Sequence, residues 1–352
     1  MKVTLWRDDV EILRPVRAAG ERHDVRSRLF VRIEDAGVHG YGEVAPQSTS
    51  LNGDASVDEV QDELETHVLH QLTEAQRRES ALPSWTRISR FAGSRPASNF
   101  AVALVEMAVL DRELRATATS VRAQWPATFA TPSMTTLSLL EHDVAWVVDA
   151  RSTQVRVKSA PGTLPTRDLD RLATLQVPVL LDFNCSARTI DEVVEQVRAV
   201  ARVATLAGVE QPFGPGNVVE HARLAERLDV ALSMDEGVRT SRDIEAIARY
   251  RAASIVCVKP ARVGGLANAH TMIERARAIG LRPYLGGFFE SPFARGVHRV
   301  LAEHCVDEPS DLAPVALAGH DNADEAHEVV DGLGWEPDEG VLERAHVLWA
   351  QG

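Results

Sequence analysis

Beyond Pro132 the chain alternates between short apolar runs and longer stretches with hydrophobic residues at every third or fourth position. The short runs predict buried parallel strands, and the longer stretches predict amphipathic helices that cover them. We place strands at 133–138, 154–158, 179–184, 205–210, 231–235, 254–259, 282–286 and 314–318. Helices are expected between them, for example at 190–203, 241–250 and 266–279. Eight strands that alternate with helices over about 190 residues predict a (β/α) barrel of the TIM type.

The first third of the chain instead alternates apolar and polar residues singly, as antiparallel strands do. We expect strands at 2–6 and 28–33, a closing segment at 40–46, an arginine-rich polar loop at 14–26, a second polar loop at 47–54, and helices at 57–72 and 99–115. This pattern predicts an α+β domain at residues 1–128, followed by the barrel domain at 129–320. The segment at 321–352 is expected to return to the first domain.

Composition narrows the class of protein. The 352 residues carry 38 basic and 51 acidic side chains, a net charge of −13, which argues against nucleic acid as a partner. No apolar run approaches the roughly 18 residues of a membrane span, and no signal-peptide core is evident, so we expect a cytoplasmic protein that does not bind membranes. The three cysteines, Cys185, Cys257 and Cys305, are widely spaced and fit a reducing compartment.

Three of the predicted strands end in an acidic residue. Asp182, Glu210 and Asp235 follow apolar runs, and the spacings of 28 and 25 residues each fit one strand, loop and helix. The carboxyl ends of barrel strands meet at one rim, where such barrels keep their active sites. Three hard oxygen ligands at one place predict a hard divalent cation, most simply Mg²⁺.

Two lysines flank these acids. Lys158 ends the strand one unit before Asp182, and Lys259 ends the strand one unit after Asp235, each 24 residues away. Arg156 shares a face with Lys158 because side chains alternate along a strand. A lysine close to a cation and to another basic group is expected to have a lowered pKa, which suits proton transfer. A metal between two bases favours abstraction of a proton α to a carboxylate, because the cation stabilises the enediolate.

With these residues in place, the sequence resembles the enolase superfamily, and within it the muconate-cycloisomerase-like subgroup. The matching motifs are RVK at 156–158, LDFN at 181–184, VEQP at 209–212, SMDE at 233–236, VKPARVGG at 258–265 and GGFFES at 286–291. GYGE at 40–43 and the helix at 99–115 look like the capping domain of that family. The resemblance covers nearly the whole chain.

The resemblance implies a modified (β/α)7β barrel with an α+β capping domain, built from the N-terminal region and the C-terminal tail. It implies that Asp182, Glu210 and Asp235 bind Mg²⁺, with Mn²⁺ as a substitute, and that Lys158 and Lys259 are acid/base groups on opposite substrate faces. Residues expected to bind substrate or support the site are Arg156, Asn184, Glu236, Gly286, Gly287 and Glu290.

The motifs also indicate a reaction. The GG-x-x-E and K-x-x-R-x-G-G forms look closest to o-succinylbenzoate synthases and N-acylamino acid racemases, which implies a small-molecule carboxylate substrate and a homo-oligomer. Muconate-type cycloisomerisation and dipeptide epimerisation are the alternatives, although the segment from Pro314 lacks the Asp-x-Asp expected of an epimerase. A non-catalytic metal-binding relative is a further alternative. Arg156 stands where the related pattern has lysine, and it can orient a carboxylate or tune Lys158 but cannot act as a base.

Overall fold

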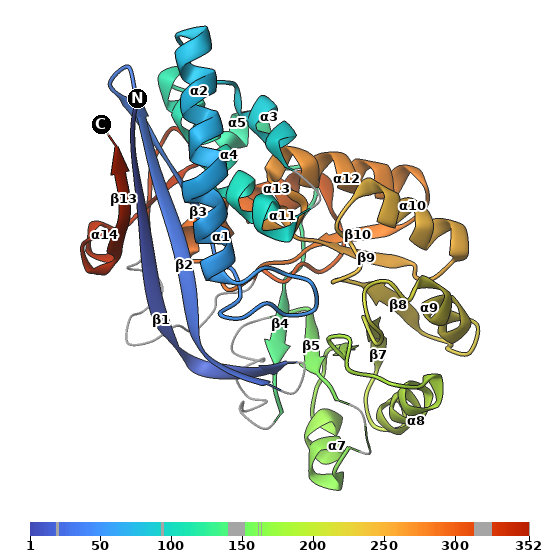
Figure 1. Ribbon diagram of the computed structural model, residues 1–352. Coiled ribbons are helices and arrows are strands. Elements are labelled where there is room, and N and C mark those ends of the chain that lie inside the picture. The colour runs from blue at the N-terminus through green and yellow to red at the C-terminus, as the bar shows by residue number, and fades with distance from the viewer. Residues whose placement is uncertain are drawn as a thin grey trace.

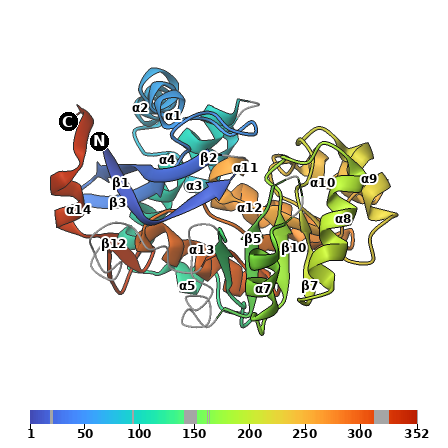
Figure 2. The same ribbon diagram turned by 90° about the horizontal axis from the view of Figure 1, so that it is seen from below.

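The computed structural model describes residues 1–18, 21–92, 95–139, 152–160, 162, 164–312 and 326–351. It contains an antiparallel sheet with its own helices and, beside it, a curved parallel sheet wrapped by helices (Figure 1). The two ends of the chain lie side by side at the edge of the antiparallel sheet in both views (Figures 1 and 2).

The antiparallel sheet has the strand order β13-β1-β2-β3. Its strands are β1 (Lys2–Ala18), β2 (Glu21–Asp35), β3 (Val38–Val44) and β13 (His346–Gln351). The expected loop at 14–26 is wrong, because β1 and β2 continue through it as a long hairpin. Val10, Ile12 and Val16 keep the period of a strand and are buried, which stabilises the extension despite its many arginines.

Helices pack on one face of this sheet. They are α1 (Val57–Glu63), a π-helical turn (Leu64–Val68), α2 (Leu69–Glu79), α3 (Trp85–Ile88), a 3₁₀ turn (Ser89–Phe91) and α4 (Pro96–Ala116). The short helix α5 (Val121–Gln124) packs instead in the core of the parallel sheet, against α13. Helix α4 is buried nearly all round and contributes to two hydrophobic cores. Phe100 and Leu104 pack in the core of the antiparallel sheet, whereas Met107 and Leu110 pack in that of the parallel sheet.

The parallel sheet has the sequential strand order β10-β9-β8-β7-β6-β5-β4, in the described part of the chain. Its strands are β4 (Met134–Leu137), β5 (Gln154–Lys158), β6 (Val179–Asp182), β7 (Leu206–Glu210), β8 (Ala231–Met234), β9 (Ile255–Val258) and β10 (Arg282–Leu285). Ser310 accepts a hydrogen bond from Met134 of β4, and Asp311 donates one to Leu285 of β10, so this segment joins the two ends of the sheet. The eighth strand predicted at 314–318 lies outside the described residues.

Helices cover the outside of this sheet (Figure 2). They are α7 (Thr166–Ala173), α8 (Ile190–Ala201), α9 (Val218–Ala225), α10 (Ser241–Tyr250), α12 (Leu266–Ala278) and α13 (Pro292–Cys305). The short helix α11 (Pro260–Val263) lies after the end of β9 and packs against α4. Capping boxes at Thr189 and Thr240 begin α8 and α10, which satisfies backbone donors at those helix starts. The predicted barrel with a capping domain is thereby confirmed, with seven strands of the barrel described.

The C-terminal segment carries a two-stranded ribbon, a short helix and the last strand. These are β11 (Ala326–Glu328), β12 (Trp335–Pro337), α14 (Glu339–Arg344) and β13. Strand β13 pairs antiparallel with β1, from Val3 opposite Gln351 to Arg7 opposite His346. The domain boundaries at 128 and 320 stay predictions. Within the described residues, none of the helices is both long and apolar enough for a membrane crossing.

Candidate functional site

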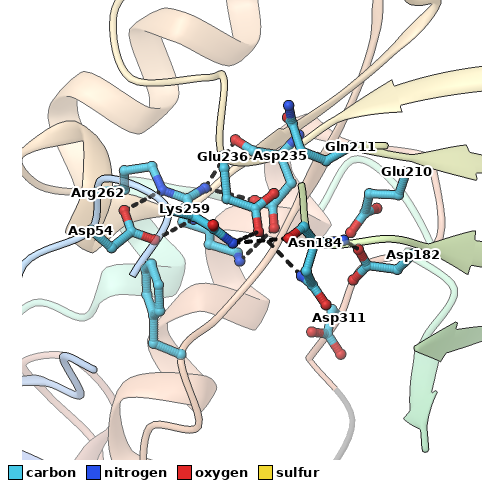
Figure 3. A network of polar contacts seen from close by, with 12 residues as sticks. Asp54, Asp182, Asn184, Glu210, Gln211, Asp235, Glu236, Lys259, Arg262 and Asp311 are labelled. Carbon is cyan, nitrogen blue, oxygen red and sulfur yellow. Dashed lines mark hydrogen bonds and ion pairs between the residues drawn. The ribbon is translucent and has the colours of Figure 1, made fainter. Parts of the chain in front are cut away.

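Three carboxylates stand at neighbouring strand ends of the parallel sheet. Asp182 and Glu210 are the last residues of β6 and β7, and Asp235 directly follows β8. All three are buried, with at most 1% of their surface exposed. The close-up view shows their side chains at the same rim, together with Glu236 and Asn184 (Figure 3). Burying three acids side by side is costly unless positive charge meets them.

Positive charge arrives from both ends of this row. Lys158, at the end of β5, donates to Asp182 Oδ2 over 2.6 Å. Lys259, directly after β9, donates to Asp235 Oδ2 over 2.8 Å, and its ammonium lies 4.7 Å from the ring centroid of Phe288. Five consecutive strands, β5 to β9, therefore carry lysine, aspartate, glutamate, aspartate and lysine in that order along the rim.

Arg156 points into the same cluster two residues before Lys158. Its Nη1 donates to Glu210 Oε1 over 3.0 Å, and its Nη2 forms a hydrogen-bonded ion pair with Asp311. Its Nε lies 3.7 Å from Asp182 Oδ2. Glu210 is held on its other side by the hydroxyl of Tyr284. The carboxylates that Arg156 orients in the structure are thus those of the protein itself.

The loop at 47–54 reaches the rim from the antiparallel domain. Asn52 donates to the Asn184 carbonyl over 3.1 Å, and Asn184 in turn donates to Glu236 Oε1 over 3.1 Å. Asp54 accepts two hydrogen bonds from Arg262, at 2.8 and 2.7 Å. Since Arg262 also donates to Asp235 Oδ1 over 2.6 Å, one guanidinium joins this loop to the row of acids.

Two predicted glycines and Glu290 lie in the loop after β10. A Cβ at Gly286 would come within 2.6 Å of Cys257 Sγ and 2.9 Å of Lys259 Cε, so only glycine leaves room for that lysine. A Cβ at Gly287 would meet Glu290 Oε2 at 2.6 Å. Glu290 accepts a hydrogen bond from Phe288 N over 2.8 Å. In the described structure these residues shape the loop next to Lys259.

Sequence reasoning gave no role to several residues of this network. They are Asp54, Tyr284, Arg262 and Asp311. Arg262 carried a signal, since it is the arginine of the K-x-x-R-x-G-G motif. Asp311 carried none, because it lies before the eighth strand that the sequence predicts at 314–318.

Burial and charge shift the pKa values of the cluster. Burial, reinforced by Asp182, raises the pKa of Glu210 from 4.5 to about 8 despite Arg156. Burial, with Asp235 as the nearest like charge, raises that of Glu236 to about 7. Burial alone would lower the pKa of Lys259, but the Asp235 carboxylate outweighs it and raises the pKa above its usual value. The lowered pKa that the sequence predicts for a lysine beside a bound cation stays a prediction.

The donor set fits a divalent cation in chemistry. Among the residues that the structure describes, buried Glu236 Oε2 and Asn184 Oδ1 accept no hydrogen bond, so two buried oxygen atoms at this rim lack a partner. Across the described ranges, no three acidic, histidine or cysteine side chains converge as a ready-made metal site. The carboxylates are turned toward lysine and arginine instead, so a bound ion would exchange places with some of these contacts.

Comparisons with known proteins bear on this site. The family described as enolase C-terminal domain-like matches residues 141–340. An N-succinylamino acid racemase from Amycolatopsis is 27% identical over 85% of this chain and 82% of its own length. A chloromuconate cycloisomerase from Cupriavidus pinatubonensis is also 27% identical, over 80% of this chain and 78% of its own.

Solved structures agree with the fold. The N-succinyl Arg/Lys racemase from Bacillus cereus superposes with a TM-score of 0.82 at 17% identity, covering 100% of this chain and 98% of the other. The L-Ala-D/L-Glu epimerase from Bacillus subtilis gives 0.77 at 18%, covering 99% of both chains. Members of this superfamily are enzymes that generally bind a divalent metal. The barrel, its capping sheet and the matched family together show that this chain belongs to the enolase superfamily, in its enolase C-terminal domain-like family.

Proposed function

We propose that this chain abstracts the proton α to the carboxylate of a small-molecule substrate, with Lys158 and Lys259 as the proton-transfer groups. The observation that carries the proposal is the order of side chains along the rim, where three buried carboxylates lie between two lysines. This arrangement leaves a base on either side of a substrate bound over the acids, which suits racemisation or epimerisation as well as one-sided proton removal.

The use of lysine in this chain supports the assignment. Of its 38 basic residues three are lysines, namely Lys2, Lys158 and Lys259, and the rest are arginines. An arginine would satisfy a buried carboxylate equally well or better, since it presents more donors and is always charged. Lysine differs in that it can lose its proton. The presence of lysine at these two positions therefore favours proton transfer over a purely structural ion pair.

The carboxylates Asp182, Glu210 and Asp235 would hold a divalent cation, which supplies electrostatic stabilisation of the negative charge that develops on the substrate carboxylate. Lys158 or Lys259 takes the α-proton, and the lysine across the substrate returns a proton when the product is an epimer. Phe288 packs against the Lys259 ammonium and limits its motion. The loop at 47–54, tied down through Asp54 and Arg262, shields the rim from water.

Among possible products, we favour those of an N-succinylamino acid racemase or an o-succinylbenzoate synthase. Relatives with these names from Amycolatopsis and Listeria innocua match 85% and 86% of this chain. Both names contain a succinyl group, in the substrate of the racemase and in the product of the synthase.

The test is hydrogen exchange at the α-carbon in D₂O with Mg²⁺, followed by NMR for both enantiomers of a panel of N-acylamino acids. Lys158→Ala and Lys259→Ala should each slow exchange of one enantiomer by about 10²–10⁴-fold, because a positioned base contributes that much. Chelation of the metal should abolish exchange, and Mg²⁺ or Mn²⁺ should restore it.

Lys2→Ala provides the matched control, since Lys2 is an exposed lysine on β1 paired with Glu34. It should leave both exchange rates unchanged. Wild-type exchange in both site variants, or full exchange in metal-stripped protein, would refute the assignment.

A further inference from the structure

Gln211 directly follows Glu210, and its fully buried side chain reaches across to the next strand end. Its Oε1 accepts hydrogen bonds from Asp235 N over 2.9 Å and from Gly237 N over 3.0 Å. Its Nε2 donates to the Phe213 carbonyl over 2.8 Å, within its own loop. The close-up view shows Gln211 between Glu210 and Asp235 (Figure 3). One neutral amide therefore joins the loop after β7 to the turn that begins with Asp235.

The backbone of Gln211 contacts both neighbouring strand ends as well. Its N–H donates to the carbonyl of Ser233 on β8 over 2.9 Å. Its own carbonyl accepts from Cys185 N over 2.8 Å, in the turn that follows Asp182 at the end of β6. Gln211 thus ties together the ends of β6, β7 and β8, and each of these ends carries one of the three buried acids.

The backbone conformation of Gln211 is uncommon. Its φ is 36°, in the left-handed region that residues other than glycine seldom occupy, and Asn184 and Cys185 after β6 have φ values of 43° and 65°. Such conformations cost free energy and persist where surrounding contacts hold them, which is frequent at functional sites. The strain at Gln211 coincides with its hydrogen bonds to both neighbouring strand ends, so these contacts are what hold it in place.

The turn after β8 depends on this side chain. Asp235 and Gly237 are buried, so their N–H groups need an acceptor inside the protein. A Cβ at Gly237 would lie 2.8 Å from Met234 Cε and 3.4 Å from Gln211 Oε1, so glycine leaves room for the amide to approach. Loss of the acceptor would leave two buried donors unsatisfied or let the turn move, and the Asp235 carboxylate would move with it.

We propose that Gln211 is a positioning residue that fixes the Asp235 carboxylate relative to those of Asp182 and Glu210. The inference rests on the proposed function for the group that these carboxylates bind, a divalent cation. Gln211 acts through its hydrogen bonds to the turn and is not itself a ligand. Its loss should therefore lower the affinity for the cation while the set of ligands stays the same.

The experiment measures Mn²⁺ binding to the metal-stripped protein by electron paramagnetic resonance, so that it does not depend on turnover. Gln211→Met removes the acceptor at similar side-chain length and should weaken Mn²⁺ binding by about 10- to 100-fold. Gln211→Glu keeps an acceptor oxygen and should bind Mn²⁺ about tenfold more tightly than Gln211→Met. In the metal-free protein, hydrogen exchange at the Asp235 and Gly237 amides should be about tenfold faster in Gln211→Met.

Gln196→Met is the control, because Gln196 on α8 is also buried and donates to Ser159 Oγ over 2.7 Å. It tests a general loss of stability and should bind Mn²⁺ within about threefold of the wild-type protein. Wild-type affinity in Gln211→Met, an equal loss in Gln196→Met, or unchanged exchange of the two amides would overturn the inference and leave the proposed function standing. If the wild-type protein binds no Mn²⁺ but the two amides exchange faster in Gln211→Met, the proposed function fails while the hold of Gln211 on the turn stands.

Discussion

Arg156 determines which carboxylates of the site are paired with a positive charge. Two residues before Lys158, it closes off one oxygen of Glu210 and one of Asp311 inside the barrel. A lysine at this position has one ammonium group and no planar fork, so it would not serve both carboxylates with the same geometry. Arg156 therefore organises acids of the site, and the proposed proton transfer is assigned to the two lysines, which can lose a proton.

Replacing Arg156 by Met should destabilise the fold by about 3–5 kcal/mol, because buried Glu210 and Asp311 lose their partner. Chemical denaturation would measure this free energy of unfolding. The free energy of unfolding of Arg156→Lys should lie between those of Arg156→Met and the wild-type protein. Combining Arg156→Met with Asp311→Asn should cost less than the sum of the two single changes. Unchanged stability in Arg156→Met would mean that the ion pairs contribute nothing.

At the scale of elements, the capping sheet depends on two glycines of β3. A Cβ at Gly42 would come within 2.1 Å of the Leu104 carbonyl of α4, and one at Gly40 within 2.3 Å of the Ala108 carbonyl. The strand thus packs directly against the backbone of the helix. This contact brings α4, which belongs to both cores, close enough to join the two sheets.

Gly42→Ala should lower the free energy of unfolding by about 1–3 kcal/mol or more, since strand and helix must separate to admit a methyl group. Thermal or urea unfolding gives the measurement. Gly216→Ala is the control, because a Cβ there meets no atom within 4 Å, and it should change stability by less than about 0.5 kcal/mol. A Gly42→Ala protein as stable as the control would show that the contact is readily relieved.

The barrel strands and most of their helices could be predicted from sequence because their patterns are strong and local. Strand β5 and helix α10 have the predicted bounds, 154–158 and 241–250. The hairpin at 14–26 could not be predicted, because a stretch rich in arginine is typical of a solvated loop. Its strands are also stabilised by pairing with each other, which the local sequence pattern does not record. The alternation of Val10, Ile12 and Val16 was the available signal.

In the site, residues at the ends of predicted strands could be located because the topology brings strand ends to one rim. Contacts between domains could not be predicted in this way. Arg262 binding Asp54, and Arg26 lying over Phe289, join segments more than 200 residues apart in sequence, and no periodicity records such pairs. Of the residues that the sequence left without a role, Asp54 and Arg262 connect the cap to the barrel, whereas Tyr284 and Asp311 bind partners within the barrel.

At the scale of the whole molecule, two buried carboxylates of the cap hold the starts of two barrel helices. Glu43 of β3 accepts from Ser291 N and Oγ, at 2.6 and 2.5 Å, where α13 begins. Glu106 of α4 accepts from Leu266 N and Ala267 N, at 2.7 and 2.9 Å, where α12 begins. Burial raises the pKa of Glu43 to about 7 and that of Glu106 to about 8. The attachment of the two domains is therefore expected to depend on pH.

The direction of this pH dependence can be worked out for Glu106. Its pKa rises from 4.5 in the unfolded chain to about 8 in the folded protein, because burial disfavours the charged form more than the two backbone N–H groups favour it. Between these values the folded protein holds a proton that the unfolded chain has lost. The stability contributed by this group is thus fully present below pH 4.5 and is lost as pH rises through about 8.

Glu106→Gln, which cannot titrate, should reduce the fall of the melting temperature between pH 5 and 8. The glutamine also loses one of the two backbone contacts, so the variant should melt lower at acid pH. Glu195→Gln on the exposed face of α8 should follow the wild-type profile, and an unaltered slope in Glu106→Gln would show that this carboxyl group does not couple cap and barrel to pH.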